Sequence, residues 1–128
     1  MHRISSPRTD DDGIEQEIKA KGLTAARVTP ADIEANIASE HYFTAADGAD
    51  GASMRVARER VGQVPLELDL LTFCVLRLRN GFVVTGESAC ASPENFDAEV
   101  GRKIARQNAV NKIWPLMGYE LKSKLAAG

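Results

Sequence analysis

The fold is decided by residues 72–85, which read TFCVLRLRNGFVVT. Two runs rich in β-branched, aromatic and aliphatic residues flank Asn80-Gly81, and this dipeptide between such runs is typical of a β-hairpin with a two-residue turn. Such a turn pairs Arg77 with Val84. One face of the predicted hairpin then carries Cys74, Leu76, Leu78, Val83 and Thr85, and the other carries Phe73, Val75, Arg77, Arg79, Phe82 and Val84. Both faces are substantially apolar, so we expect cover on both sides.

Two helix starts are marked in the flanking sequence. Thr29-Pro30-Ala31-Asp32 combines an N-cap residue, proline at the first helical position and an early acid, and Tyr42-Phe43 is expected at the end of that helix. Ser92-Pro93-Glu94 repeats the pattern and predicts a long helix from Pro93 to about Ile113, because Pro115 disfavours helical geometry at the residue before it. Weaker patterns predict a helix over 14–21, a loop over 45–51, a third strand over 66–71 and a final helix over 120–125.

These elements predict one α+β domain over residues 14–128, preceded by a flexible tail over residues 1–13. The domain is expected to have N-terminal helices, an antiparallel β-hairpin or three-stranded sheet, and a long C-terminal helix packed on it.

Composition narrows the class of function. The 128 residues carry a formal net charge of −2, which argues against general nucleic-acid or anionic-membrane binding. No apolar run approaches the roughly 18 residues that span a bilayer, and the N-terminus lacks a signal-peptide core. We therefore expect a cytoplasmic protein.

Reactive side chains are few. Cys74 and Cys90 have only His2 and His41 as possible partners, so we expect no metal site and no cofactor. Cys90 precedes a helix start, where a thiolate is favoured. Carboxylates gather near the same start, at Glu87, Glu94, Asp97 and Glu99. A cysteine- or carboxylate-dependent enzyme is therefore the third hypothesis, behind two binding functions.

The long helix carries the candidate ligand-binding residues. Its apolar arc holds Phe96, Val100, Ile104, Val110 and Trp114, with Gln107 and Asn111 inside the arc and Asn108 at its edge. Buried amides need partners, which are either backbone groups or a ligand. Arg77 and Arg79 share a strand face, where they either clamp an anion or cover apolar surface. The candidate ligand site thus comprises Arg77, Arg79, Gln107, Asn108 and Asn111.

A homo-oligomer, most simply a dimer, is expected from two features. The hairpin is apolar on both faces, and Gly101 and Ala105 form a small-residue step that lets another backbone approach. The candidate oligomer interface is Val75, Phe82, Val84, Gly101 and Ala105.

The C-terminal half also resembles a known family. The segments 71–76, 80–90, 95–105 and 113–119, together with 29–33 and 41–46, are similar to a small bacteriophage and prophage family named after gene products forty-nine and sixty-six of two enterobacterial podophages. The resemblance begins at about Val28. It implies a phage or prophage accessory protein in the host bacterial cytoplasm, and it carries no catalytic residues or cofactor.

Two binding functions follow as hypotheses. The first is an accessory protein that binds and modulates a host bacterial protein. The second is an oligomeric sponge that sequesters a nucleotide-type immune signal, and so counters a host defence.

Overall fold

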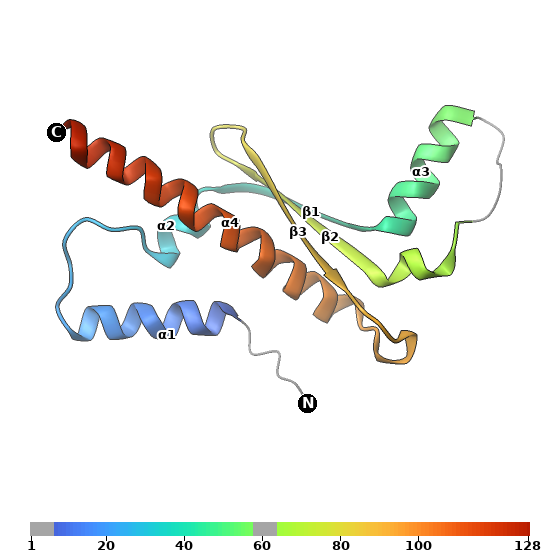
Figure 1. Ribbon diagram of the computed structural model, residues 1–128, viewed down its shortest axis with the longest axis horizontal. Coiled ribbons are helices and arrows are strands. Elements are labelled where there is room, and N and C mark those ends of the chain that lie inside the picture. Colours follow the sequence, from blue (N-terminus) through green and yellow to red (C-terminus); the bar gives the residue numbers. More distant parts are fainter. Residues whose placement is uncertain (1–6, 58–63) are drawn as a thin grey trace.

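The computed structural model describes residues 7–57 and 64–128 (Figure 1). It confirms the α+β class, with N-terminal helices, a three-stranded antiparallel sheet and a long C-terminal helix. In chain order the elements are α1 (Pro7–Ala20), α2 (Pro30–Ala35), β1 (Ile37–Thr44), α3 (Ala45–Ala57), the 3-10 helix η1 (Leu66–Leu70), β2 (Leu71–Leu78), β3 (Val83–Ala89), the 3-10 helix η2 (Pro93–Asn95) and α4 (Ala98–Ala127).

The third strand of the sheet is β1. Of residues 66–71, predicted as a third strand, 66–70 form η1 and Leu71 begins β2. The predicted N-cap at Thr29 is present, and it forms a capping box in which Thr29 and Asp32 exchange side-chain to backbone hydrogen bonds of 3.1 and 2.9 Å. However, α2 ends at Ala35, and Tyr42 and Phe43 belong to β1. Tyr42 packs against the core whereas Phe43 is exposed, which is the two-residue alternation of a half-buried strand.

The predicted hairpin register is wrong by one residue. The turn has three residues, with Leu78 N–H donating to Phe82 O and Gly81 N–H donating to Leu78 O, and Gly81 takes φ of 91°. A type I turn followed by a left-handed glycine is a common alternative to the two-residue turn. Arg77 therefore pairs with Val83 instead of Val84. Because a one-residue slip moves every side chain to the other face, Val84 enters the core.

The helix α4 differs from its prediction at both ends. Its N-cap is Asp97, whose side chain accepts a hydrogen bond from Val100 N–H, and residues 93–95 form the separate turn η2. At the other end the helix continues through Pro115 to Ala127. Trp114 and Met117 pack against the core on either side of Pro115, so tertiary contacts offset the local cost of proline.

The core lies between α4 and one face of the sheet. Its buried apolar residues are Ile33, Cys74, Leu76, Leu78, Val84, Ala105, Ala109, Val110 and Ile113. The helix backbone touches β3 at Gly86, where an added Cβ would lie 2.3 Å from both Ala105 O and Ala109 N. Gly101, Ala105 and Ala109 thus contact the sheet, because small residues permit the closest approach of the helix to the strands.

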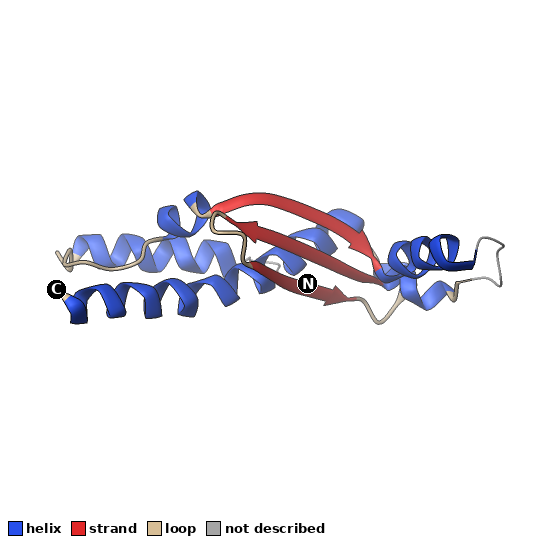
Figure 2. Ribbon diagram, turned by 90° about the horizontal axis from the view of Figure 1, so that it is seen from above, coloured by secondary structure: helices blue, strands red, loops and turns tan. Residues whose placement is uncertain are grey.

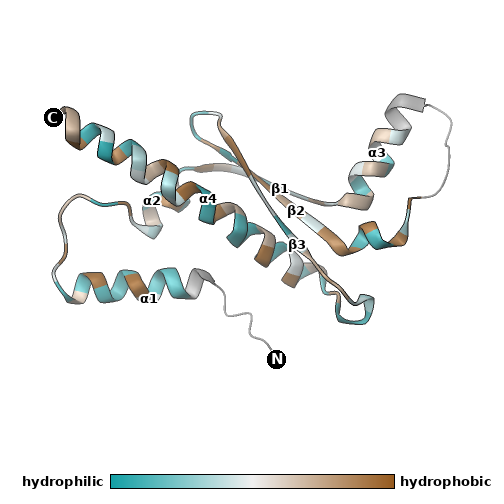
Figure 3. Cartoon of the chain, in the orientation of Figure 1, coloured by the Kyte–Doolittle hydropathy of each residue, from teal (hydrophilic) through white to brown (hydrophobic). Residues whose placement is uncertain are grey.

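The remaining helices extend the molecule at its two ends (Figure 2). Residues 45–57 form α3 where a loop was predicted over 45–51, and Thr44 and Asp47 build a second capping box at its start. Helix α1 begins at Pro7, inside the predicted tail, whose residues 1–6 lie outside the described part of the chain. Figure 3 shows hydrophobic and hydrophilic segments alternating along the whole of α4, including the half that projects past the sheet.

Candidate functional site

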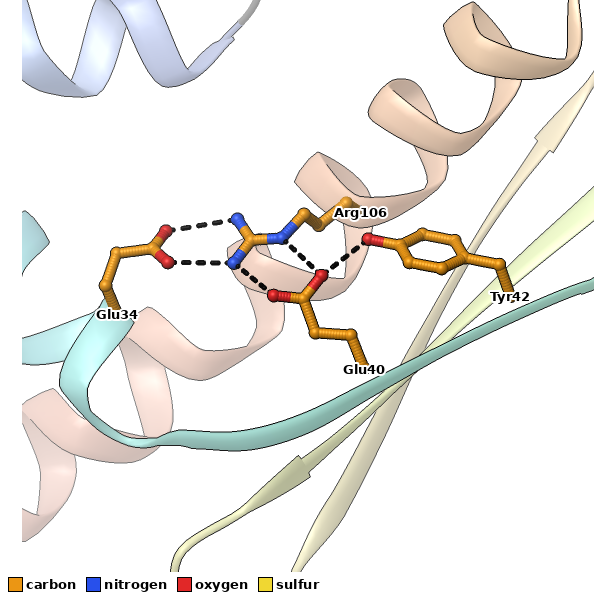
Figure 4. Close-up of polar contacts among 4 residues, drawn as sticks. All are labelled: Glu34, Glu40, Tyr42 and Arg106. Carbon is orange, nitrogen blue, oxygen red and sulfur yellow. Dashed lines mark hydrogen bonds and ion pairs between the residues drawn. The ribbon is translucent and has the colours of Figure 1, made fainter.

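Among the described side chains, the guanidinium of Arg106 forms the largest set of hydrogen bonds (Figure 4). Its Nη1 and Nη2 donate to the two carboxylate oxygens of Glu34 on α2, at 3.0 and 2.8 Å. Its Nε and Nη2 donate to both oxygens of Glu40 on β1, at 3.1 and 3.0 Å. Tyr42 completes the group by donating its hydroxyl to Glu40 at 2.7 Å. Two bidentate pairs therefore tie α4 to α2 and to β1.

The protonation states of this cluster are held by the same contacts. The hydrogen bonds from Arg106 lower the pKa of Glu40. The pKa of Tyr42 is raised mainly by burial and, to a smaller extent, by the hydrogen bond to Glu40. The bonds to Glu34 and Glu40 raise the pKa of Arg106. Tyr42 therefore stays protonated and Arg106 is already occupied by two carboxylates. This arrangement suits positioning of the elements rather than proton transfer or anion capture.

Sequence reasoning missed this cluster. Arg106 lies 72 positions after Glu34 and 66 after Glu40, so no local spacing joins them. The one available signal is that Glu40 and Tyr42 are two apart, which places them on one side of a strand once β1 is recognised.

The three candidate amides on α4 find partners inside the chain. Asn108 Nδ2 donates to the backbone oxygen of Glu87 on β3 at 2.8 Å. Gln107 is buried, and its Nε2 donates to Asn111 Oδ1 at 2.8 Å and reaches Asp11 on α1 at 3.5 Å. The contact of Asn108 matches the structural alternative, in which the amides bond the hairpin backbone, whereas Gln107 bonds side chains of α4 and α1.

The two candidate arginines lie away from those amides. Arg77 is on the sheet face opposite α4, where its Nε donates to Ser39 Oγ at 3.2 Å. Arg79 is in the hairpin turn, and its Nε donates to the backbone oxygen of Ala35. The five predicted ligand-binding residues are therefore not brought together within one chain.

The predicted interface residues divide between core and surface. Val84, Gly101 and Ala105 are buried between the sheet and α4 within the chain, whereas Val75 and Phe82 are not. Val75 lies at the centre of the sheet face that α4 does not cover, which we call the outer face. The outer face consists of three rows of residues that are neighbours across β1, β2 and β3. These rows are Ser39, Arg77 and Val83; His41, Val75 and Thr85; and Phe43, Phe73 and Glu87.

A second exposed surface lies on the C-terminal half of α4, which extends beyond the sheet in both views (Figures 1 and 2). Leu116 is 41% exposed and Tyr119 is 77% exposed. Their three-residue spacing places them side by side on the helix, with Lys112 one turn earlier on the same side. We call Lys112, Leu116 and Tyr119 the α4 stripe.

The residues of the enzyme hypothesis have structural contacts. Cys90 Sγ donates to Ser92 O at 3.1 Å, and burial raises the pKa of Cys74. Glu94 accepts a hydrogen bond from Ser92, which lowers the pKa of Glu94, and Glu99 pairs with Lys103. Over residues 7–57 and 64–128, no three His, Cys, Asp or Glu side chains are grouped so as to hold a metal ion.

None of the described helices is long and apolar enough to cross a membrane. The comparison with curated proteins gives no match, and neither does the comparison with solved structures. A family of phage proteins, described as N4 Gp49/phage Sf6 gene 66, has a sequence model that matches residues 28–125. That range runs from just before α2 to near the end of α4, so it includes the whole sheet and leaves out α1. The chain therefore belongs to the N4 Gp49/phage Sf6 gene 66 family of phage proteins.

Proposed function

We propose that this phage protein is a non-enzymatic accessory protein, and that it binds a protein of the host cytoplasm through the α4 stripe. The observation that carries the proposal is the pair of large exposed side chains on the projecting half of α4. Leu116 and Tyr119 face a different side of the helix from Trp114 and Met117, which pack on the core. They therefore add nothing to the core of this chain, whereas a helix presenting such anchors suits a hydrophobic groove on a partner.

The charge around the stripe defines the partner's chemistry. Between residues 112 and 128 the chain has three lysines, Lys112, Lys122 and Lys124, against the single acid Glu120. Opposite charges across an interface accelerate association and select partners. We therefore propose an apolar groove with an acidic rim as the complementary surface on the host protein.

The other two hypotheses have less support from the geometry. A nucleotide sponge built from the predicted residues needs Arg77 and Arg79 beside the α4 amides. Arg77 lies on the sheet face opposite α4, Arg79 bonds the backbone of Ala35 from the hairpin turn, and Gln107 and Asn108 already donate to partners in the chain. An enzyme built from the predicted residues needs an activated thiol or carboxylate. Cys90 instead donates to the backbone oxygen of Ser92, and Glu94 and Asp97 accept hydrogen bonds from Ser92 and Val100. Binding of a host protein is the function that the described residues favour.

The test places a photo-crosslinking amino acid at position 119 and expresses the protein in the bacterial host. The matched control carries it at position 66, because Leu66 is 80% exposed but lies in η1 at the other end of the molecule. A defined host protein crosslinked at position 119 and not at position 66 is expected. Its affinity for the purified chain should then fall at least about tenfold with Leu116→Glu and stay unchanged with Leu66→Glu.

Three results would contradict the proposal. They are no crosslinked protein at position 119, the same crosslinked proteins at positions 119 and 66, or an affinity that Leu116→Glu leaves intact. A thermal shift produced by cyclic nucleotides and lost with Arg77→Ala would instead favour the sponge.

A further inference from the structure

The outer face of the sheet has no cover within the described chain. Phe43 and Val83 are exposed on it, Phe73 and Val75 are half-buried, and the rings of Phe43 and Phe73 lie 5.7 Å apart. Helix α3 starts beside this aromatic pair and bounds only that end of the face. An antiparallel sheet with one solvated face normally carries polar residues there, so the four apolar side chains among the nine on this face indicate contact with another surface.

Charges on the outer face are arranged so that two copies complement each other. Arg77 belongs to the row at the hairpin end, and Glu87 belongs to the row at the opposite end. The two positions are four residues apart along the strands, or about 13 Å, so they do not pair within one chain. Neither residue forms an ion pair with any other described residue.

We propose that two copies of this chain pack outer face to outer face. The two-fold axis lies in the plane between the two sheets and runs perpendicular to the strands. This axis exchanges the two ends of the face, so Arg77 of each copy lies near Glu87 of the other. The central row, His41, Val75 and Thr85, then meets its own counterpart. A two-fold axis parallel to the strands would instead stack Arg77 on Arg77, and like charges placed opposite each other disfavour that arrangement.

The size of the face sets the expected strength of the dimer. Three strands about 4.8 Å apart and eight residues long give a flat footprint of roughly 400 Å², about half of what each partner in a standard interface buries. The dimer should therefore dissociate in the micromolar range, and the α4 stripe, on the opposite side of the sheet, stays free for a host protein. This inference is independent of the proposed function, because it rests on different residues.

The experiment is analytical ultracentrifugation of the full chain from about 1 to about 200 µM, a range chosen for a micromolar dimer. Wild-type protein is expected to shift from monomer to dimer across it. Arg77→Glu alone and Glu87→Arg alone should each raise the dissociation constant about tenfold or more, because each homodimer then contains two like-charged contacts.

Mixing the two single variants provides the decisive measurement. In the mixed dimer the first chain has glutamate at both positions and the second has arginine at both, so both contacts become attractive again. Native mass spectrometry of the mixture should show the heterodimer dominating over both homodimers. Because both variants are surface changes, circular dichroism spectra matching the wild type are expected for each.

The proposal is overturned by a wild-type chain that stays monomeric at the highest concentration, which would assign the outer face to a different protein. It is also overturned by a dimer that neither variant weakens. Single variants that weaken the dimer without preferring each other in the mixture would refute the axis perpendicular to the strands.

Discussion

Among the described glycines, Gly86 is the one at which an added methyl group would come closest to other atoms. A Cβ at this position would lie 2.3 Å from Ala105 O, 2.3 Å from Ala109 N and 2.8 Å from the carbonyl carbon of Asn108. All three atoms belong to the α4 backbone, so no side chain can rotate away to make room. Because carbon contacts are normally about 3.5 Å, the helix must withdraw from β3 by roughly 1 Å.

The cost follows from the residues that the withdrawal loosens. A gap of up to 1 Å forfeits a quarter to a half of the dispersion energy across it, and Val110 and Ile113 bury their side chains in this layer. Overpacking strain of about 1–3 kcal/mol adds to that loss, and the better strand propensity of alanine returns about 0.5–1 kcal/mol. We expect Gly86→Ala to lower the free energy of unfolding by about 3 kcal/mol.

Urea unfolding monitored by circular dichroism should show this loss as a midpoint that is lower by about 1–2 M urea than in the wild type. The matched control is Gly118→Ala in α4, because an added Cβ there meets no atom within 4 Å. The control should be stabilised by up to about 1 kcal/mol, since alanine is the better helix former. Equal midpoints for Gly86→Ala and the wild type would refute the close approach of α4 to β3.

Three further changes test other parts of the structure. Arg106→Lys should lower the free energy of unfolding, measured in urea, by about 1 kcal/mol, because an ammonium cannot form two bidentate pairs. An unchanged urea midpoint would argue against the cluster of Figure 4. Arg106 lowers the pKa of Glu40 in the folded chain from its ordinary value of 4.5. The ionised Glu40 therefore stabilises the fold above pH 4.5, and this stabilisation is lost as the pH falls through the lowered pKa. Glu40→Gln should therefore flatten the acid limb of the stability profile, and the same acid limb in wild type and variant would refute this linkage. Gly81→Ala should lower the melting temperature, with a cost of about 1 kcal/mol or more, because Gly81 has φ of 91°, and a tolerated alanine would contradict the three-residue turn.

Local signals in the sequence predicted the local features well. The N-cap at Thr29, the glycine turn at residue 81 and the strand run in β2 each rest on residues that are adjacent or three apart. The hairpin register was missed because Asn-Gly fits both a two-residue turn and a type I turn followed by a left-handed glycine. What decides between them is burial of Val84 under α4, which is a tertiary contact.

Features that join distant parts of the sequence were missed because they also depend on tertiary contacts. The strand β1 pairs with β2 across the intervening α3, and its alternation is weak because Ser39, Glu40 and His41 are polar on both faces. The cluster around Arg106 joins three elements that only the folded sheet brings together. Of the three amides predicted on the apolar helix face, only Gln107 is buried, whereas Asn108 and Asn111 are exposed. Gln107 donates to Asn111, and Asn108 donates to the backbone of Glu87.

The small residues of α4 connect the fold with both proposals. Because Ala105 and Ala109 let the helix lie directly on the backbone of β3 at Gly86, and Gly101 lies beside Thr72 of β2, one helix covers one face of the sheet at close range. A larger residue at Gly86 would lift the helix and expose the core, so the small-residue contact fixes the angle at which α4 leaves the sheet. That angle carries Leu116 and Tyr119 away from the outer face. Binding of a host protein at α4 and pairing of two copies through the sheet are therefore compatible, and Val75→Glu should abolish the second while leaving the first intact.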